Sequence, residues 1–118
     1  MEDRLDTVRP LVVPEIVTLP AEIDFTNADS VGEELRAAFR PGVAVVIADM
    51  TATTFSDSAA GRNLLLANDK AAEAQAELRL AIPSATVLRT LTILGLDRVL
   101  QIYPSLESAL TSGGSSAK

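Results

Sequence analysis

The chain has 118 residues, a formal net charge of −6, and neither cysteine nor histidine. These absences exclude disulfides, thiol nucleophiles, Ser-His-acid triads and the usual zinc sites, while the acidic balance argues against a surface that binds nucleic acid. Apolar residues make up 47% of the chain and aromatic residues only 3%, so length and composition predict one domain with an aliphatic core.

The N-terminal part of the chain shows the patterns of two strands. Residues 1–9 carry alternating charges and predict a loosely ordered start to a domain that spans residues 10–110. Residues 11–18 have the composition of a strand, and Pro14, which cannot donate to a ladder, favours an edge position. A second short strand is expected within residues 21–25.

A helix and a buried strand follow. Thr26 or Asn27 can serve as the N-cap of the helix. Its buried face is a set of apolar residues at helical spacing, namely Val31, Leu35, Ala38 and Phe39. A Pro-Gly pair then ends the helix. Residues 43–49 form a short apolar run, rich in β-branched residues and closed by Asp49, which is typical of a buried strand that stops at a polar surface.

The middle of the chain predicts a loop, a long helix and a strand. Residues 50–57 show no period and predict the loop, and residues 58–75 have a helical pattern. Three consecutive leucines at 64–66 exceed a normal buried stripe, so one of them is expected to point outward. In residues 78–82, leucine and isoleucine alternate with Arg79 and an alanine, which predicts a half-buried strand.

The last third predicts a helix, a strand and a second helix. Ser84 stands where it can cap the first of these helices, and Gly95 fits a left-handed helix end. Residues 99–103 predict the short strand and residues 105–110 the final short helix. Residues 111–118 are rich in serine and glycine and predict a disordered tail.

The order of these elements predicts the fold class. From residue 27 onward strands alternate with helices, which favours parallel pairing with helices packed on the sheet. The N-terminal strand has no crossover helix before it, so it is expected to pair antiparallel at one edge. The prediction is a single α/β domain with a small mixed β-sheet of about 4–5 strands, an N-terminal edge strand, and about four α-helices.

Ser58 is the first candidate for function, because it lies where a chain leaving a strand turns into a helix. Such a position presents a hydroxyl together with free backbone N–H groups. Two interpretations remain open: Ser58 is an ordinary N-cap, or it accepts a phosphate as well. A phosphate would add about −1.5 to −2 charge beside Asp57. Two unit charges ~6 Å apart repel by roughly 3 kcal/mol at an effective dielectric of ~20, which corresponds to about two decades of affinity.

Three acids and a second serine accompany Ser58. Asp24, Asp49 and Asp57 are either turn formers or members of an acidic cluster that would attract a basic face of a partner. Three acids of unknown spacing are weak evidence for a metal, so no metal site is predicted. Ser56 is interpreted as a loop hydroxyl, with a second phosphoacceptor as the alternative.

The ordered series of motifs resembles the STAS family, in particular the stand-alone anti-sigma factor antagonists of bacteria. The family pattern is an apolar strand, an Asp, a short loop with a Phe, and then Asp-Ser before a leucine-rich helix. The segments that carry the resemblance are residues 21–24, 45–49, Phe55, 57–61, 64–65, 76–80, 83–84, 94–99 and 103–110. The resemblance implies a small mixed sheet with helices and an exposed Asp-Ser turn.

The resemblance also implies a function and its partners. The unphosphorylated form would bind an anti-sigma factor, typically a serine kinase that uses ATP, and so release a sigma factor for transcription. Phosphorylation of Ser58 would end the interaction, Asp24 would assist the kinase, and a metal-dependent Ser/Thr phosphatase would restore binding. The protein itself would need no cofactor and catalyse nothing. The implied partner-binding residues are Asp24, Asp49, Phe55, Ser56, Asp57, Ser58, Ala59, Gly61 and Arg62.

One departure from the family pattern concerns the glycine after Asp-Ser. It comes one place late, so that Ala60 precedes Gly61, and this is expected to alter how a partner docks. An alternative function is an accessory STAS subunit of a membrane transporter, acting through protein contacts. A hydrolase that uses Ser58 lacks a histidine base. We expect a cytoplasmic monomer or weak dimer with no direct membrane contact, because no apolar run reaches ~20 residues and no secretion signal is visible.

Overall fold

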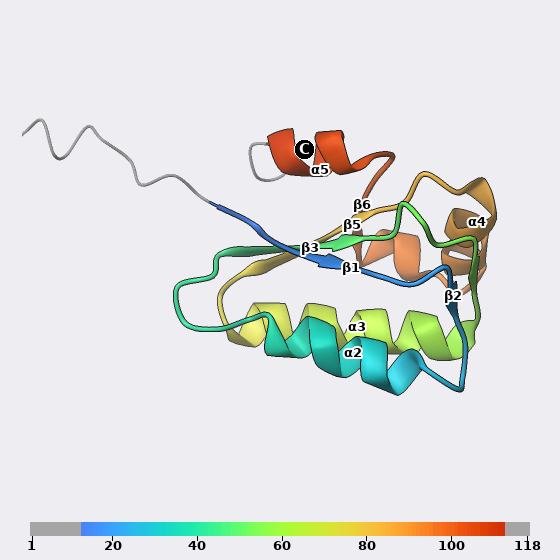
Figure 1. The fold of residues 1–118 in the computed structure, drawn as a ribbon, viewed down its shortest axis with the longest axis horizontal. Coiled ribbons are helices and arrows are strands. Elements are labelled where there is room, and N and C mark those ends of the chain that lie inside the picture. The colour runs from blue at the N-terminus through green and yellow to red at the C-terminus, as the bar shows by residue number, and fades with distance from the viewer. Residues whose placement is uncertain (1–12, 113–118) are drawn as a thin grey trace, which may run out of the picture.

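The computed structural model describes residues 13–112, so the expectations for residues 1–9 and for residues 113–118 of the tail lie outside the described part. A four-stranded sheet forms the centre of the molecule, in the order β1-β3-β5-β6 (Figure 1). Its strands are β1 (Glu15–Thr18), β3 (Val45–Asp49), β5 (Glu77–Ala81) and β6 (Gln101–Tyr103). The α/β fold class and the edge position of the N-terminal strand are therefore confirmed.

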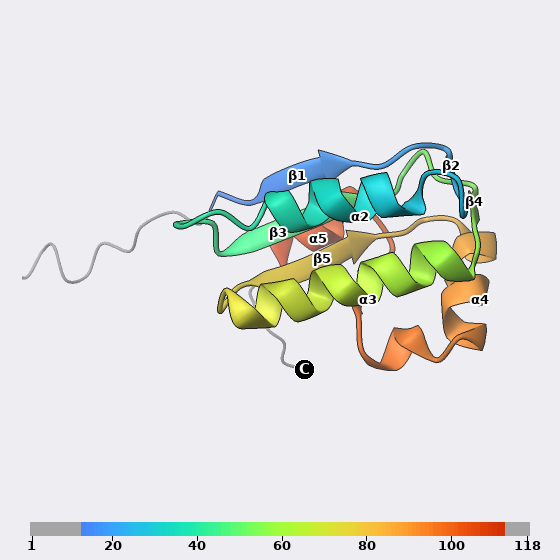
Figure 2. The ribbon, with the colours of Figure 1, turned by 90° about the horizontal axis from the view of Figure 1, so that it is seen from below.

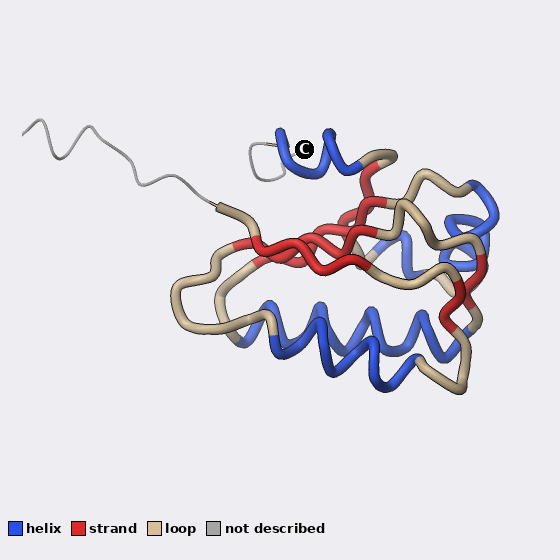
Figure 3. Tube along the Cα trace, in the orientation of Figure 1, coloured by secondary structure: helices blue, strands red, loops and turns tan. Residues whose placement is uncertain are grey.

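A second, two-stranded sheet lies at one end of the molecule, where Figure 3 shows it as a separate pair of strands. It consists of β2 (Glu22–Ile23) and β4 (Phe55–Ser56), which pair in parallel. The sequence predicted only a loop for residues 50–57, and β4 was missed because two residues carry no period.

All strand pairs in the described part of the chain are parallel, so the predicted mixed sheet and the antiparallel pairing of the N-terminal strand are wrong. The sequence prediction rested on the absence of a crossover helix before β1, whereas the direction of pairing is set by the connection that follows β1. From β1 the chain runs through β2 and then returns along helix α2 (Ala28–Ala37), which brings β3 beside β1 in the same direction. This connection is itself a crossover, and crossovers join parallel strands.

Two helices lie side by side against one face of the central sheet (Figures 1 and 2). They are α2 and α3 (Ser58–Glu73), and the main core fills the space between them and the sheet. This core is aliphatic as predicted, and its fully buried members include Leu35, Leu78 and Leu80. Of the three consecutive leucines in α3, Leu64 is buried and Leu66 is 44% exposed, as the pattern required.

The remaining helices close the end and the opposite face of the molecule. Helix α4 (Ala85–Ile93) lies near the β2–β4 pair, and the 3-10 turn η1 (Leu96–Arg98) leads from α4 to β6. Helix α5 (Leu106–Thr111) covers the second face of the sheet (Figure 1). The predicted cap of α4 is confirmed, because the Ser84 side chain accepts from the backbone of Val87 at 3.2 Å. Gly95 is left-handed, with a φ of 79°, as expected for that helix end.

Because α5 covers the second face, β5 is buried on both faces and the prediction of a half-buried strand is wrong. Arg79 is only 5% exposed. Its guanidinium donates to the backbone oxygens of Ala109 at 2.8 Å and Ser112 at 3.2 Å, and it pairs with Glu77 at 3.1 Å. A buried charge is tolerated where its donors are satisfied in this way, so Arg79 fastens the end of α5 to the sheet.

Candidate functional site

Ser58 is the first residue of α3 and its side chain is exposed. The residue before it, Asp57, is the N-cap: its Oδ1 accepts from the backbone N–H of Ala60 at 3.1 Å. The interpretation of Ser58 as the cap is therefore wrong, since the helix start already has a side-chain acceptor from Asp57. The Ser58 hydroxyl makes no hydrogen bond within the described part of the chain, and it is accessible from solvent.

The second carboxylate oxygen of Asp57 reaches a different segment. Asp57 Oδ2 accepts from the backbone N–H of Phe25 at 3.0 Å, across a separation of 32 residues. One carboxylate thus joins the start of α3 to the turn between β2 and α2. We call the region made of β2, β4, the turn at residues 24–27 and the first turn of α3 the Ser58 end of the molecule; it lies at the right in Figures 1 and 2.

Phe25 itself is a surface feature that the sequence interpretation missed. Its side chain is 81% exposed, and Phe55, on the neighbouring β4, is 47% exposed. Large exposed aromatic side chains are common anchors of protein interfaces. The sequence did contain a signal for this exposed side chain. Phe25 directly follows Asp24, the acid at the end of a short strand, and the rest of that turn is polar.

Asp24 shapes the same turn. Its Oδ1 accepts from the side-chain hydroxyl of Thr26 and, at 2.9 Å, from the Thr26 backbone N–H. These hydrogen bonds, the one from the hydroxyl first, lower the pKa of Asp24 below its ordinary value of 3.8. The Asn27 side chain completes the turn, because its oxygen accepts from the Asp24 backbone N–H at 2.8 Å and its amide nitrogen donates to the backbone oxygen of Glu22 at 2.9 Å.

Asp49 stands apart from the acids at the Ser58 end. Its Oδ1 accepts from the Thr51 backbone N–H at 3.0 Å and from the Thr51 hydroxyl, which closes a local turn after β3. Asp24 directly precedes Phe25 in the chain and Asp57 accepts from the Phe25 N–H, but the three acids form no common cluster among the described residues. No group of histidine, cysteine or acidic residues that could hold a metal ion occurs between Val13 and Ser112.

The other predicted site residues divide into outward and inward groups. Phe55 and Arg62 are exposed and Ala59 is half-buried. Ser56 is only 4% exposed, and its Oγ has no hydrogen-bond partner. The alternation of side chains along a strand explains the difference between Phe55 and Ser56. Of the two residues of β4, Phe55 therefore reaches the surface and Ser56 does not.

Gly61 is buried, and its position explains the late glycine of the sequence. A Cβ atom at this position would lie 2.9 Å from Cδ1 of Leu94 and 2.9 Å from Cδ1 of Leu96. The first turn of α3 thus packs against the segment that links α4 to η1. Gly61 therefore serves an internal contact and is itself buried.

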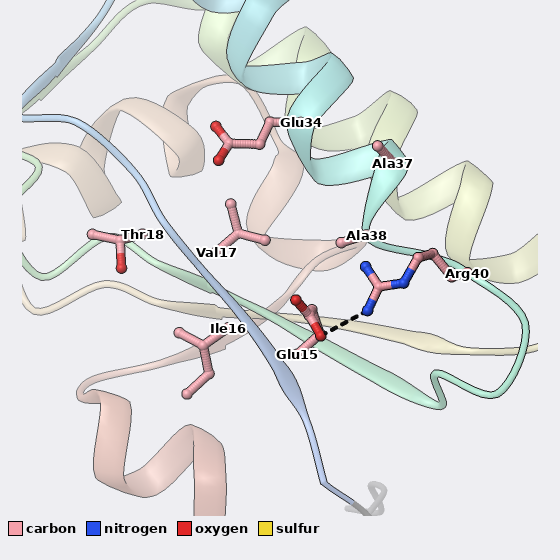
Figure 4. Close-up of a pocket in the computed structure, with 8 residues that line it drawn as sticks. All are labelled: Glu15, Ile16, Val17, Thr18, Glu34, Ala37, Ala38 and Arg40. Carbon is pink, nitrogen blue, oxygen red and sulfur yellow. Dashed lines mark hydrogen bonds and ion pairs between the residues drawn. The ribbon is translucent and has the colours of Figure 1, made fainter.

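A groove of about 340 Å³ lies elsewhere, between β1 and α2 (Figure 4). Arg40 and Glu15 form an ion pair of 3.1 Å across it, and Glu34 lines it from α2. Both partners of the pair are well exposed, so the pair adds little stability. None of the residues that the sequence predicted for the site lines this groove.

The arrangement is that of a small α/β domain with a hydroxyl at an exposed helix start. The model of the STAS domain matches residues 7–109, and the chain therefore belongs to the STAS domain family. A search of curated protein sequences gives no significant match. Between Val13 and Ser112, no helix combines the length and the apolar character needed to cross a membrane.

Several solved structures share the fold. A protein of Thermotoga maritima described as an anti-sigma factor antagonist has a TM-score of 0.70 at 18% identity, over 85% of this chain and 88% of that one. SpoIIAA, an anti-sigma factor antagonist in its unphosphorylated form, has a TM-score of 0.62 at 15% identity, over 87% and 90%. A sulfate transporter family protein of Wolinella succinogenes has a TM-score of 0.73 at 20% identity, over 90% and 88%.

Proposed function

We propose that this protein is an anti-sigma factor antagonist, a non-catalytic binding module that is switched by phosphorylation of Ser58. The observation that carries the proposal is the exposed Ser58 hydroxyl at the first position of α3, on the same end of the molecule as the exposed Phe25 and Phe55. The likeness of fold to two anti-sigma factor antagonists supports the same function.

The proposed surface suits a partner with basic and apolar groups. Its two phenylalanines supply apolar contact, and Asp24 and Asp57 supply negative charge beside them. The partner that the proposal requires is an anti-sigma factor that is also a serine kinase. Such a partner must both dock on this surface and reach the Ser58 hydroxyl, and the exposure of that hydroxyl permits it.

Phosphorylation would change the charge of this surface. A phosphoserine carries about −1.5 to −2 charge at neutral pH. The new charge would enter a region that already holds two carboxylates, so acidic groups of the partner and the close fit of the interface would both oppose binding. A Ser/Thr phosphatase would remove the phosphate and restore the binding form.

The test combines modification and binding. Mass spectrometry of the protein from its native cell should find phosphate on Ser58. Ser58→Ala should retain binding to the kinase recovered with the protein, and Ser58→Asp should weaken it by at least about tenfold. Ser30, an exposed serine of α2, supplies the matched control, and Ser30→Asp should bind as the original does. Equal binding by all of these variants would refute the switch.

A second candidate function is an accessory subunit of a membrane transporter. The observation that favours it is the likeness of fold to the sulfate transporter family protein. The two functions differ in the partner that a tagged copy of this chain captures from its native cell. A permease or a transporter ATPase would support the second candidate, and a serine kinase that phosphorylates Ser58 would support the first.

A further inference from the structure

We propose that Asp57 is a positioning residue that holds the backbone of Phe25 in place for partner binding, and that phosphorylation of Ser58 releases this hold. The proposal rests on the phosphorylation proposed above. It adds a conformational step to the switch: the modified protein gains charge, and it also loses the fixed backbone position from which the Phe25 side chain projects.

The hydrogen bonds of the Ser58 end single out Asp57. The β2–β4 pairing ends with the bond from the Asp57 N–H to the Ile23 oxygen, at 3.2 Å. Beyond that point, the turn at residues 24–27 has its own internal bonds through Asp24 and Asn27. Among the described residues, the one hydrogen bond that ties this turn to α3 is the bond of 3.0 Å from the Phe25 N–H to Asp57 Oδ2.

Packing gives Phe25 little other restraint. Its side chain is 81% exposed, so few neighbouring atoms fix its direction. The place from which the side chain projects therefore depends on the Phe25 backbone, and the backbone N–H is held by the Asp57 carboxylate. A turn whose backbone is already fixed before binding loses less entropy when it binds, and this improves affinity.

The phosphate and the Asp57 carboxylate would compete for the same helix start. The kinase transfers the γ-phosphoryl group of ATP to Ser58 Oγ: the new P–O bond forms, the bond to ADP breaks, and the hydroxyl proton passes to a base of the kinase. The product is an anion directly after Asp57 in sequence. Both anions can accept from the first backbone N–H groups of α3, which include that of Ala60. Repulsion between them would move the carboxylate off one or both of its bonds.

The expected readout is the backbone amide of Phe25. In ¹⁵N-labelled protein with phosphoserine installed at position 58, solvent exchange of this amide should rise by about tenfold over the unmodified protein. Asp57→Ala should raise it by a similar factor, and phosphoserine should then add no further change. Asp57→Asn keeps a good N-cap but has one acceptor oxygen for two donors, so it folds and shows a partial rise.

Asp49→Ala is the matched control, because Asp49 also closes a turn with its carboxylate but shares no hydrogen bond with Phe25. This variant should leave the Phe25 amide unchanged. If Asp49→Ala and Asp57→Ala raise its exchange equally, the effect is a general loosening and the positioning role is wrong.

Binding measured on the same samples separates this proposal from the proposed function. If phosphoserine abolishes kinase binding while the Phe25 amide stays protected, the switch stands and the role of Asp57 in it is wrong. If the amide is released while binding is unchanged, the role of Asp57 stands and the proposed function fails. Release and loss of binding together support both.

Discussion

The layer beneath the central sheet and the Ser58 end of the molecule differ in what holds them. Beneath the sheet, α2 and α3 bury aliphatic side chains such as Leu35 and Leu64 almost completely. At the Ser58 end, two-residue strands and a turn are joined by hydrogen bonds through Asp24 and Asp57. Burial contributes most of the folding free energy, while single exposed hydrogen bonds contribute little. The turn at residues 24–27 can therefore change its arrangement without loss of the fold, while Ile23 and Ala60 of the same end stay anchored in the main core.

The largest expected effect comes from removing a buried leucine beneath the sheet. Leu64→Ala should lower the free energy of unfolding by about 2–5 kcal/mol, because it removes apolar contact and leaves a cavity. Chemical denaturation followed by circular dichroism measures this change. Leu66→Ala in the same helix is the control, since Leu66 is 44% exposed, and a change within about 0.5 kcal/mol is expected there. Equal losses of unfolding free energy in the two variants would contradict the assignment of Leu64 as buried and Leu66 as exposed.

A second test acts on the contact between α2 and α3. A Cβ atom on Gly32 would lie 2.1 Å from Oδ1 of Asn63, whose side chain is 4% exposed. Gly32→Ala should therefore displace this amide, which donates to Asp29 at 3.1 Å and to the Ala59 oxygen at 3.1 Å. We expect a loss of about 1–3 kcal/mol in denaturation. Ser30→Ala, on the exposed side of α2, should cause no loss; stability unchanged in Gly32→Ala would show that the helices separate easily.

The third test compares two serines at the Ser58 end, and here a substitution is expected to raise the free energy of unfolding instead of lowering it. The Ser56 hydroxyl is buried without a partner, so Ser56→Ala should raise the free energy of unfolding by up to about 1 kcal/mol. Ser58→Ala should leave it nearly unchanged, because the Ser58 side chain is exposed and Asp57 is the cap. Thermal unfolding of the two variants measures the difference. A marked loss in Ser56→Ala would mean that its hydroxyl does have a partner in solution.

The smallest effect is the titration of Asp24. Its folded pKa is lowered below 3.8, so its hydrogen bonds with Thr26 favour the folded state above the unfolded pKa. That contribution is lost as the pH falls through the folded pKa. An NMR titration should place the Asp24 midpoint below 3.8, and Thr26→Ala should shift it upward. Thr51→Ala, the corresponding change at Asp49, should leave the Asp24 midpoint where it was.

Much of the layered fold was predictable because its elements are long and periodic. The buried face of α2, the start of α3 at Ser58 and the cap of α4 at Ser84 all follow from local pattern. The parallel pairing of β1 did not follow, because it depends on where α2 returns the chain. The burial of Arg79 did not follow either, since it requires the carbonyl oxygens of a helix 30 residues away.

The candidate site was predictable in position but not in detail. The change from strand to helix located Ser58, yet Asp and Ser are both good N-caps, and only the structure assigns the cap to Asp57. Phe25 was missed because its link to Asp57 spans 32 residues. The packing of Gly61 against Leu94 and Leu96 was not predicted, because these residues lie more than 30 positions further along the chain. The sequence pattern predicts which residues begin a helix or strand, but it does not predict which distant residues their side chains contact.

The Arg79 fastening has a practical consequence for anyone who shortens or tags this protein. The guanidinium donates to the backbone oxygens of Ala109 and Ser112, and the Tyr103 hydroxyl lies 3.1 Å from Ser112 Oγ. A version cut back to residue 108 would leave a cation inside the sheet with only Glu77 to neutralise it, and would open the apolar surface of Val45 and Ile47 to water. Purification handles should therefore be joined after Ser112.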